Sequence, residues 1–369
     1  MNNQSEKWEN DLTRILNVKY PIIQAPMFGV TTPEMVAAAA KAGALGSLAL
    51  GDLPAEKCIE LIRATKKLTD KPFAVNIFLN PLPEPTEELK LQYLQTQEFL
   101  KTFSDKNQLD VDYPDYEDIK LTDYHDQVNA IIAENCKAVS FTFGILDPES
   151  IALLKKNRTT LIGTATSVEE AIILEEAGID IVCVQGYEAG GHRGSFIDSK
   201  IPEIGGISLL SQVDDHVNVP LMYAGGIYDA KTLWAASLLG AQGFQVGSLL
   251  LGSAESALQE FEKHTLKNAT EKDIVLTKSF SGRYARGLKN IFTNTLDRSA
   301  YILPYPYQNK ITAPLRAAAK LRQNPGFLSI WTGQSKSSYS TASTADIIKD
   351  LIKEAENFNR TLFKPHSEI

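Results

Sequence analysis

The sequence predicts an α/β protein whose repeated strand–helix units close into a (β/α)₈ barrel. Short apolar, β-branched runs alternate along the 369 residues with amphipathic helical segments, which is the rhythm of βα units. The runs are apolar at nearly every position, as parallel strands are when both faces of the sheet are covered. Eight such units in series favour a closed barrel over an open doubly wound sheet, and one barrel with insertions accommodates this length.

The first three units occupy the chain up to residue 78. The helix after the first strand begins at Thr32 and Pro33, a pair suited to the N-cap and the first helical position, and it stops at Gly43. The predicted strands are 20–27, 44–50 and 73–78, and the helix after the second strand covers 54–68.

An insertion interrupts the alternation after the third strand. Residues 80–126 contain Pro81, Pro83 and Pro85, followed by a mixed charged and aromatic run. Part of this insertion has helical spacing, which predicts a helix over 87–103.

Five more units follow the insertion, and a helix near 127–136 leads into them. Ser167 and Glu170 have the spacing of a capping box at the start of one helix. The predicted strands are 138–144, 160–165, 180–186, 219–226 and 243–248, with helices at 148–156, 167–177 and 229–239.

The pattern loosens after residue 251. Helical spacing at 254–267, 314–322 and 344–357 predicts a mainly helical C-terminal extension packed on the barrel rather than an independent domain. We therefore divide the chain into a barrel over 1–252, with its insertion at about 80–126, and an extension over 253–369.

The composition indicates a globular enzyme or ligand-binding protein. Hydrophobic residues make up 43% of the chain, and a net charge of −8 argues against a nucleic-acid binder, which needs a basic face. The three cysteines are odd in number and lack CxxC spacing, so neither a disulfide framework nor a metal site is expected. The amino terminus lacks the apolar core of a signal peptide, and no run approaches the roughly 20 apolar residues of a membrane-spanning helix. We expect a cytoplasmic protein without nucleic-acid or membrane partners.

Glycines after the last two barrel strands indicate a phosphate site. Barrel active sites lie at the C-terminal ends of the strands, and the loops after strands seven and eight are the usual phosphate clamp. Strand seven ends in Gly225 and Gly226, and strand eight ends in Gln245, Val246, Gly247 and Ser248. Glycine permits close approach of the backbone, and N–H groups near a helix start favour an anion. This pattern predicts phosphate binding without distinguishing FMN from a sugar phosphate.

A glycine-rich loop at the end of strand six contains the candidate catalytic residue, His192. Four glycines lie within residues 185–194, so this loop can lie flat against a ring system. His192 follows Gly190 and Gly191 directly. An imidazole that titrates near neutrality can remove an α-proton or polarise a substrate oxygen.

Several short motifs occur in a fixed order along most of the chain. They are PIIQAPM at 21–27, VNIF at 75–78, QGYEAGGHRG at 185–194, AGG at 224–226 and QVGS at 245–248. The extension adds FSGRYARG at 280–287, YPYQN at 305–309 and WTGQ at 331–334. In this order and spacing the set resembles the bacterial, FMN-dependent nitronate monooxygenases, formerly called 2-nitropropane dioxygenases.

The resemblance implies an FMN-dependent enzyme that oxidises alkyl nitronates with O₂ to a carbonyl compound and nitrite. The amides of Asn76 and Gln185 would bond the flavin edge, and backbone groups of the glycine loops would hold the phosphate. By position, the FMN contacts are Ala25, Pro26, Met27, Asn76, Gln185, Gly190, Gly191, Gly225, Gly226, Gln245, Val246, Gly247 and Ser248. His192 would lie beside the flavin, either as a base toward neutral nitroalkanes or as a hydrogen-bond donor to a nitronate.

Four residues of the extension are candidate substrate contacts. They are Tyr305, Tyr307, Lys310 and Trp331. An anionic nitronate suits a cation and phenol donors, although packing within the extension explains the same residues equally well. The partners implied are a small nitronate and O₂, acting on a monomer or a weak homodimer.

Three other functions compete with this interpretation. An FMN-dependent enoyl-acyl-carrier-protein reductase, or another NAD(P)H-dependent flavin reductase, shares the Glu-Ala-Gly-Gly-His loop but usually has a shorter tail. A flavin-binding barrel without turnover is less consistent with His192 in its glycine-rich loop. A non-flavin aldolase or isomerase typically places a lysine or paired carboxylates at strand ends, and the predicted strand ends carry neither.

Overall fold

The structure is a computed structural model that describes residues 8–197, 200–335 and 339–362. Its centre is a barrel of eight parallel strands in the order β1-β9-β8-β6-β5-β4-β3-β2. A parallel bridge between Ile23 and Leu45 joins β1 to β2 and brings the two ends of the sheet together. The strands are β1 (Ile22–Gln24), β2 (Gly46–Gly51), β3 (Phe73–Phe78), β4 (Ala138–Thr142), β5 (Thr160–Ala165), β6 (Ile181–Gln185), β8 (Leu221–Ala224) and β9 (Gly243–Val246). The predicted (β/α)₈ TIM-barrel fold is confirmed, and all eight strands lie within their predicted ranges or within one residue of them.

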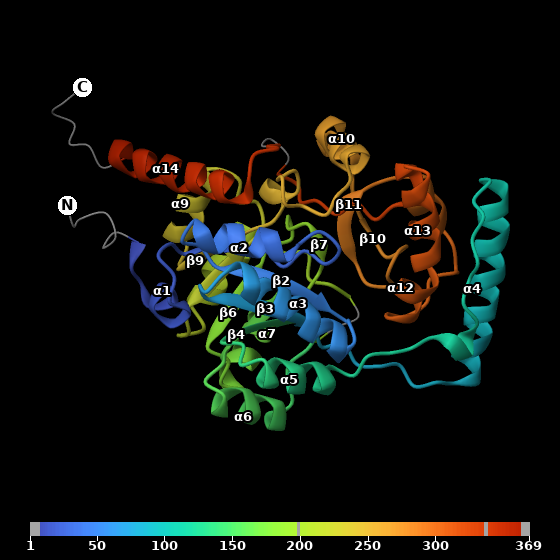
Figure 1. Cartoon of the computed structure of the whole chain (residues 1–369), viewed down its shortest axis with the longest axis horizontal. Coiled ribbons are helices and arrows are strands. Elements are labelled where there is room, and N and C mark those ends of the chain that lie inside the picture. Colours follow the sequence, from blue (N-terminus) through green and yellow to red (C-terminus); the bar gives the residue numbers. More distant parts are fainter. Residues whose placement is uncertain (1–7, 198–199, 336–338, 363–369) are drawn as a thin grey trace.

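Helices cover the outside of the barrel (Figure 1). The first is capped as predicted, because the Thr32 side chain accepts a hydrogen bond from the Met35 N–H. These helices are α2 (Pro33–Lys41), α3 (Ala55–Leu68), α5 (Tyr124–Ala133), α6 (Pro148–Lys156), α7 (Val168–Glu176), α8 (Gly206–Asp214), α9 (Ala230–Leu238) and α14 (Thr344–Leu362). No helix is predicted from the sequence at α8.

The start of α7 forms only half of the predicted capping box. The Ser167 side chain accepts from the Glu170 N–H, as expected. The Glu170 carboxylate, however, accepts from the backbone N–H groups of Thr166 and Phe196, each at 2.6 Å. Glu170 therefore ties α7 to the loop that follows the glycine-rich segment.

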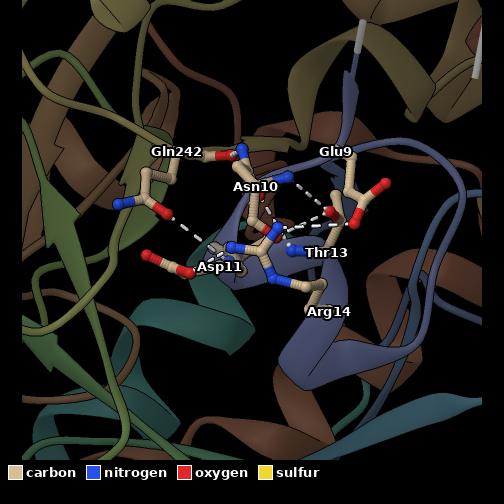
Figure 2. A network of polar contacts seen from close by, with 7 residues as sticks. Glu9, Asn10, Asp11, Thr13, Arg14 and Gln242 are labelled. Atoms are coloured by element: carbon tan, nitrogen blue, oxygen red, sulfur yellow. Dashed lines mark hydrogen bonds and ion pairs between the residues drawn. The ribbon is translucent and has the colours of Figure 1, made fainter. Parts of the chain in front are cut away.

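A short helix absent from the sequence-based prediction, α1 (Asp11–Leu16), covers the N-terminal end of the barrel. Asn10 caps this helix, and its side-chain nitrogen donates to the Gln242 carbonyl at 2.7 Å (Figure 2). Gln242 directly precedes β9, so α1 lies at the end of the barrel where the strands begin. Leu12 is fully buried in the barrel's interior core, and a side chain at Gly243 would collide with it.

The C-terminal extension contains more strand than its sequence suggests. The strands β10 (Ile274–Thr277) and β11 (Ala285–Leu288) form an antiparallel pair, and β11 also pairs with β7 (Gly191–His192). Strands of two to four residues have too few positions to display an alternating pattern. The helix predicted at 254–267 begins later, as α10 (Glu260–Asn268), where the Glu262 carboxylate accepts from the Gln259 N–H at 2.8 Å.

The insertion and the extension pack together in what we call the second core. Phe103 of α4 (Glu87–Lys106) contacts Phe292 of α11 (Ile291–Leu296) and Phe327, with ring centroids 5.8 Å apart in each pair. Figure 1 shows α4 beside α12 (Tyr307–Ile311) and α13 (Ala313–Leu321), away from the barrel strands. The remaining short elements are η2 (Tyr116–Asp118), η3 (Ser248–Leu250), η4 (Glu271–Asp273) and η5 (Pro325–Phe327). The helix predicted at 87–103 is confirmed and is three residues longer, whereas the domain division at residue 252 stays a prediction.

No helix in the described ranges is long and apolar enough to cross a membrane.

Candidate active site

A cavity of about 420 Å³ lies at the C-terminal ends of the barrel strands. Strand ends supply one side of it, with Asn76 and Phe78 from β3, Thr142 from β4 and Thr164 from β5. The extension supplies much of the other side, including Phe280, Ser281, Tyr305, Trp331, Thr332 and Gly333. Both the position and the volume are those of a ligand site in a barrel enzyme.

Most of the residues selected from the sequence line this cavity. They are Ala25, Pro26, Met27, Asn76, Gln185, Gly190, Gly191, His192, Gly225, Gly226, Gln245, Gly247, Ser248, Tyr305 and Trp331. Val246 does not line it, and its side chain is buried in the core between sheet and helices. What each of these residues binds stays a prediction.

Two of the four candidate substrate residues lie elsewhere. Tyr307 stacks on Tyr116 in the second core, with ring centroids 5.5 Å apart. The Lys310 ammonium forms an ion pair with the Asp52 carboxylate at 3.0 Å. Neither Tyr307 nor Lys310 lines the cavity. Packing and an ion pair thus hold the side chains of Tyr307 and Lys310 outside the cavity, and their expected contact with a substrate stays a prediction.

Backbone donors gather at the ends of β8 and β9. Gly225 and Gly226 have φ angles of +129° and +70°, which side-chain-bearing residues rarely adopt. The N–H groups of Gly225, Gly226, Gly247 and Ser248 donate to no backbone carbonyl of the described residues. These four N–H groups, which we call the cradle, have no carbonyl acceptor in the described ranges and lie on a wall lined by glycine. They are suited to bind an anion.

The C-terminal extension closes this cradle from above the barrel. The Gly333 N–H donates to Ser248 Oγ at 2.8 Å, and Ser335 Oγ donates to the Gly226 carbonyl at 3.3 Å. A side chain at Gly190 would collide with the backbone of Thr332 and Gly333. The glycine at position 190 is therefore required for the close approach of two backbones.

The amide of Gln185 is used to shape the loop that carries His192. Its nitrogen donates to the His192 carbonyl at 2.9 Å, and its oxygen accepts from the Gly194 N–H at 2.9 Å. Pairing of His192 with Ala285 in the small sheet holds the loop from its other side. Both ends of the Gln185 amide are thus occupied within the protein.

Buried charged side chains support the same loop from behind. Arg193 donates to the carbonyls of Gln185 and Gly186, and Arg286 donates to the carbonyl of Tyr187. Glu188 accepts from the Tyr223 hydroxyl at 2.6 Å and from the Gly206 N–H at 2.9 Å. Because these groups bond backbone atoms on both sides of the loop, the path of the glycine-rich segment is set before any ligand enters.

His192 projects into an aromatic corner of the cavity. Its ring lies 5.5 Å from the centroids of both Phe143 and Trp331. Its Nε2 is 2.8 Å from Ser281 Oγ, which itself lies 3.1 Å from the Arg283 carbonyl. If the Ser281 hydroxyl donates to that carbonyl, His192 Nε2 carries the proton and Nδ1 is an acceptor. If the hydroxyl donates to Nε2, Nδ1 carries the proton and is a donor.

Burial keeps the imidazole uncharged. Together with the positive charges of Arg283 and Arg316, it lowers the pKa of His192 to about 3. His192 is therefore neutral at pH 7, and it meets a substrate as a neutral acceptor or donor rather than as a cation.

Sequence reasoning missed several residues that line the cavity. Thr142 and Thr164 stand at the ends of β4 and β5, so the barrel-rim rule could have found them. Ser281, Asn309 and Arg316 lie in the extension, where no local pattern marks them as neighbours of His192.

Comparisons with known proteins agree with this geometry. The family model described as "Nitronate monooxygenase" matches residues 9–354. The chain is 38% identical over 363 residues to a probable nitronate monooxygenase of Staphylococcus saprophyticus, an alignment that covers 96% of this chain and all of that protein.

Two solved structures are similar over nearly their full lengths. The nitroalkane oxidase of Streptomyces ansochromogenes superposes with a TM-score of 0.85 at 32% identity, covering 96% of this chain and 100% of that one. FabK of Thermotoga maritima superposes with a TM-score of 0.72 at 27% identity, covering 96% and 98% of the two chains.

Proposed function

Because the chain belongs to the nitronate monooxygenase family, we propose that it is an FMN-dependent oxidoreductase that converts alkyl nitronates and O₂ to a carbonyl compound and nitrite. One observation carries this proposal. A single cavity holds the candidate catalytic His192 together with a glycine-lined cradle of backbone donors.

The residues at the rim fit FMN. The N–H groups of Gly225, Gly226, Gly247 and Ser248 would hold its phosphate. A Cβ at Gly191 would meet nothing within 4 Å, which leaves room for a ring system against the backbone of this loop. When bound, FMN supplies the redox chemistry, accepting electrons from the substrate and passing them to O₂.

The protein contributes orientation and one hydrogen-bonding group at the reacting end. Neutral His192 would face the substrate with Nδ1, since Nε2 bonds Ser281. For a nitronate, Nδ1–H would donate to an anionic oxygen, with Ser281 donating to Nε2. For a neutral nitroalkane, unprotonated Nδ1 would accept the α-proton, with Nε2 donating to Ser281, although the low pKa of His192 makes it a weak base. The two roles therefore differ in whether the Ser281 hydroxyl donates its hydrogen to His192 Nε2 or accepts one from it.

Aromatic and aliphatic side chains limit the access of water to this space. Phe78, Phe280 and Trp331 line it together with Met27 and Leu251. A low-dielectric surrounding strengthens each hydrogen bond made to the substrate anion.

The similarity to FabK supports a second candidate, an NAD(P)H-dependent flavin reductase. The two functions differ in the electron donor. The test is to mix the purified yellow protein anaerobically with ethyl nitronate, follow the flavin absorbance, then admit air and assay nitrite. Bleaching by the nitronate followed by nitrite release is the expected result. Bleaching by NADH or NADPH, with no response to the nitronate, would favour the reductase.

We further infer a cytoplasmic enzyme that acts as a monomer or a weak homodimer. Light scattering over a range of protein concentrations would test the assembly. A stable tetramer would contradict it.

A further inference from the structure

We propose that Arg316 on α13 is the counter-charge that fixes an anionic substrate in the cavity and selects ionised nitronates over neutral nitroalkanes. This inference rests on the proposed function and names a specificity-determining residue for it.

Arg316 lines the cavity without a carboxylate partner. Its Nη2 donates to the Asn309 carbonyl at 2.7 Å and to Asn309 Oδ1 at 2.8 Å. Among the described residues, no Asp or Glu oxygen lies within 4.0 Å of the guanidinium, and Nη1 has no acceptor. Burial lowers the pKa of Arg316 only to about 10, so the group stays charged at neutral pH.

The other buried arginines near the site are arranged differently. Arg193, Arg283 and Arg286 each donate to backbone carbonyls of the loops around the site. None of these three lines the cavity. Lys320 does line it, but Glu262 neutralises Lys320 at 2.8 Å. In the described part of the cavity wall, Arg316 is therefore a positive charge with no carboxylate within ion-pair distance.

The acid that could balance Arg316 is already engaged. Asp52 interacts with Arg316 electrostatically but pairs with Lys310 at 3.0 Å and does not line the cavity. Tyr305 does line it, and burial together with the nearby Asp52 carboxylate raises the pKa of its hydroxyl. A cation and a phenol therefore occur on the same wall of the cavity.

Arg316 and His192 act on the same space. Both residues line the cavity, and the positive charge of Arg316 contributes to the lowered pKa of His192.

A nitronate matches this arrangement in charge and in shape. A guanidinium offers planar, paired donors that fit two oxygens on one trigonal atom, and charge-assisted bonds are stronger than neutral ones. The guanidinium of Arg316 is partly buried and has no carboxylate partner, so an anion that enters the cavity gains a favourable charge interaction there. A neutral nitroalkane has the two oxygens but not the charge.

The test compares Arg316→Met and Arg316→Lys with a matched control, Arg322→Met. Arg322 follows the last residue of the same helix, is exposed and does not line the cavity. For each holoenzyme, kcat and KM for ethyl nitronate are measured by O₂ uptake. Binding of nitrate, a planar anion, is measured by titration calorimetry. FMN content and melting temperature show that each variant is folded and loaded.

Arg316→Met is expected to raise KM and to weaken nitrate binding by about 10- to 100-fold, the range of one charge-assisted hydrogen bond, with a smaller change in kcat. Arg316→Lys should have a KM and a nitrate affinity between those of Arg316→Met and the wild type. Arg322→Met should match the wild type in both. If Arg316→Met has the same nitrate affinity and the same KM as the wild type, the inference is overturned. It is also overturned if the wild-type protein binds no nitrate. If the wild type binds nitrate through Arg316 but oxidises no nitronate, the proposed function fails while the anion subsite stands.

Discussion

His192 illustrates how the chemistry of a single residue depends on its neighbours. On its own, an imidazole is half charged near pH 6.5. In this cavity, burial and two nearby guanidinium groups hold it neutral, and Ser281 occupies one of its two nitrogens. One ring nitrogen, Nδ1, is left without a hydrogen bond to the described residues.

Substitution of this residue tests its role directly. We expect His192→Asn to keep FMN, because the cradle and loop contacts are made by other atoms, and to slow neutral nitroalkanes by about 10²- to 10⁴-fold, the usual contribution of a general base. Oxygen uptake with nitroethane and with ethyl nitronate measures both reactions. Equal activity in the variant and the wild type would remove His192 from the mechanism.

At the scale of elements, the cavity depends on two backbones that meet. The glycine-rich loop after β6 and the segment after Trp331 approach closely at Gly190 and Gly333. Neither segment alone encloses a ligand, and each is held by its own bonds to the barrel.

A methyl group at this contact should separate the two segments. Gly190→Ala places a Cβ against the backbone of Thr332 and Gly333, which cannot rotate away as a side chain could. We expect FMN affinity to fall by about 5- to 150-fold, since an overpacking cost of about 1–3 kcal/mol opposes closure of the cradle. Flavin fluorescence titration measures the affinity. Gly205→Ala is the control, because a Cβ there meets nothing within 4 Å, and equal affinities in the two variants would contradict the argument.

The helix α1 contributes to stability at the opposite end of the barrel. Leu12 is fully buried among the inward-facing strand residues. Leu12→Ala should lower the free energy of unfolding by about 2–5 kcal/mol, the cost of a buried leucine cavity. Because the helix lies away from the catalytic rim, kcat should not change.

Urea denaturation measures the free energy of unfolding of Leu12→Ala, and a steady-state assay measures its kcat. Ile15→Ala, an exposed position of the same helix, serves as the control and should change the free energy of unfolding little. A loss of activity without a loss of stability in Leu12→Ala would place α1 in a different role.

At the scale of the whole molecule, folding links the neutral state of His192 to acid stability. The folded pKa of about 3 lies below the value of 6.5 for an exposed histidine. Below pH 6.5 the unfolded chain therefore binds a proton that the folded chain does not, so stability falls as the pH decreases toward 3. The slope from this one group reaches about 1.4 kcal/mol per pH unit.

His192→Gln should remove this contribution and flatten the loss of stability between pH 6 and pH 4. Urea midpoints across that range measure the slope. His264→Gln is the matched control, because His264 is exposed. Parallel curves for His192→Gln and the wild type would show that His192 is not held neutral in the folded protein.

Local sequence patterns are sufficient to predict the barrel and the position of its rim. Uniformly apolar strands and amphipathic helices are local patterns, and each of the eight strands was found from its own residues. The rim glycines and His192 were found because barrel topology places the end of every strand at the same face. The strands β7 (Gly-His) and β11 (Ala-Arg-Gly-Leu) are not apolar runs, and the helix α1 spans only six residues, so no local pattern predicts them.

Tertiary structure alone decided which residues of the extension enter the site. Tyr305 and Tyr307 are two positions apart, yet one lines the cavity and the other stacks on Tyr116 in the second core. Ser281 reaches His192 across 89 positions of sequence, and Gly333 reaches Ser248 across 85. Such contacts form only when the extension packs against the insertion and folds back over the barrel. They cannot be predicted from local periodicity because long-range packing orients these side chains.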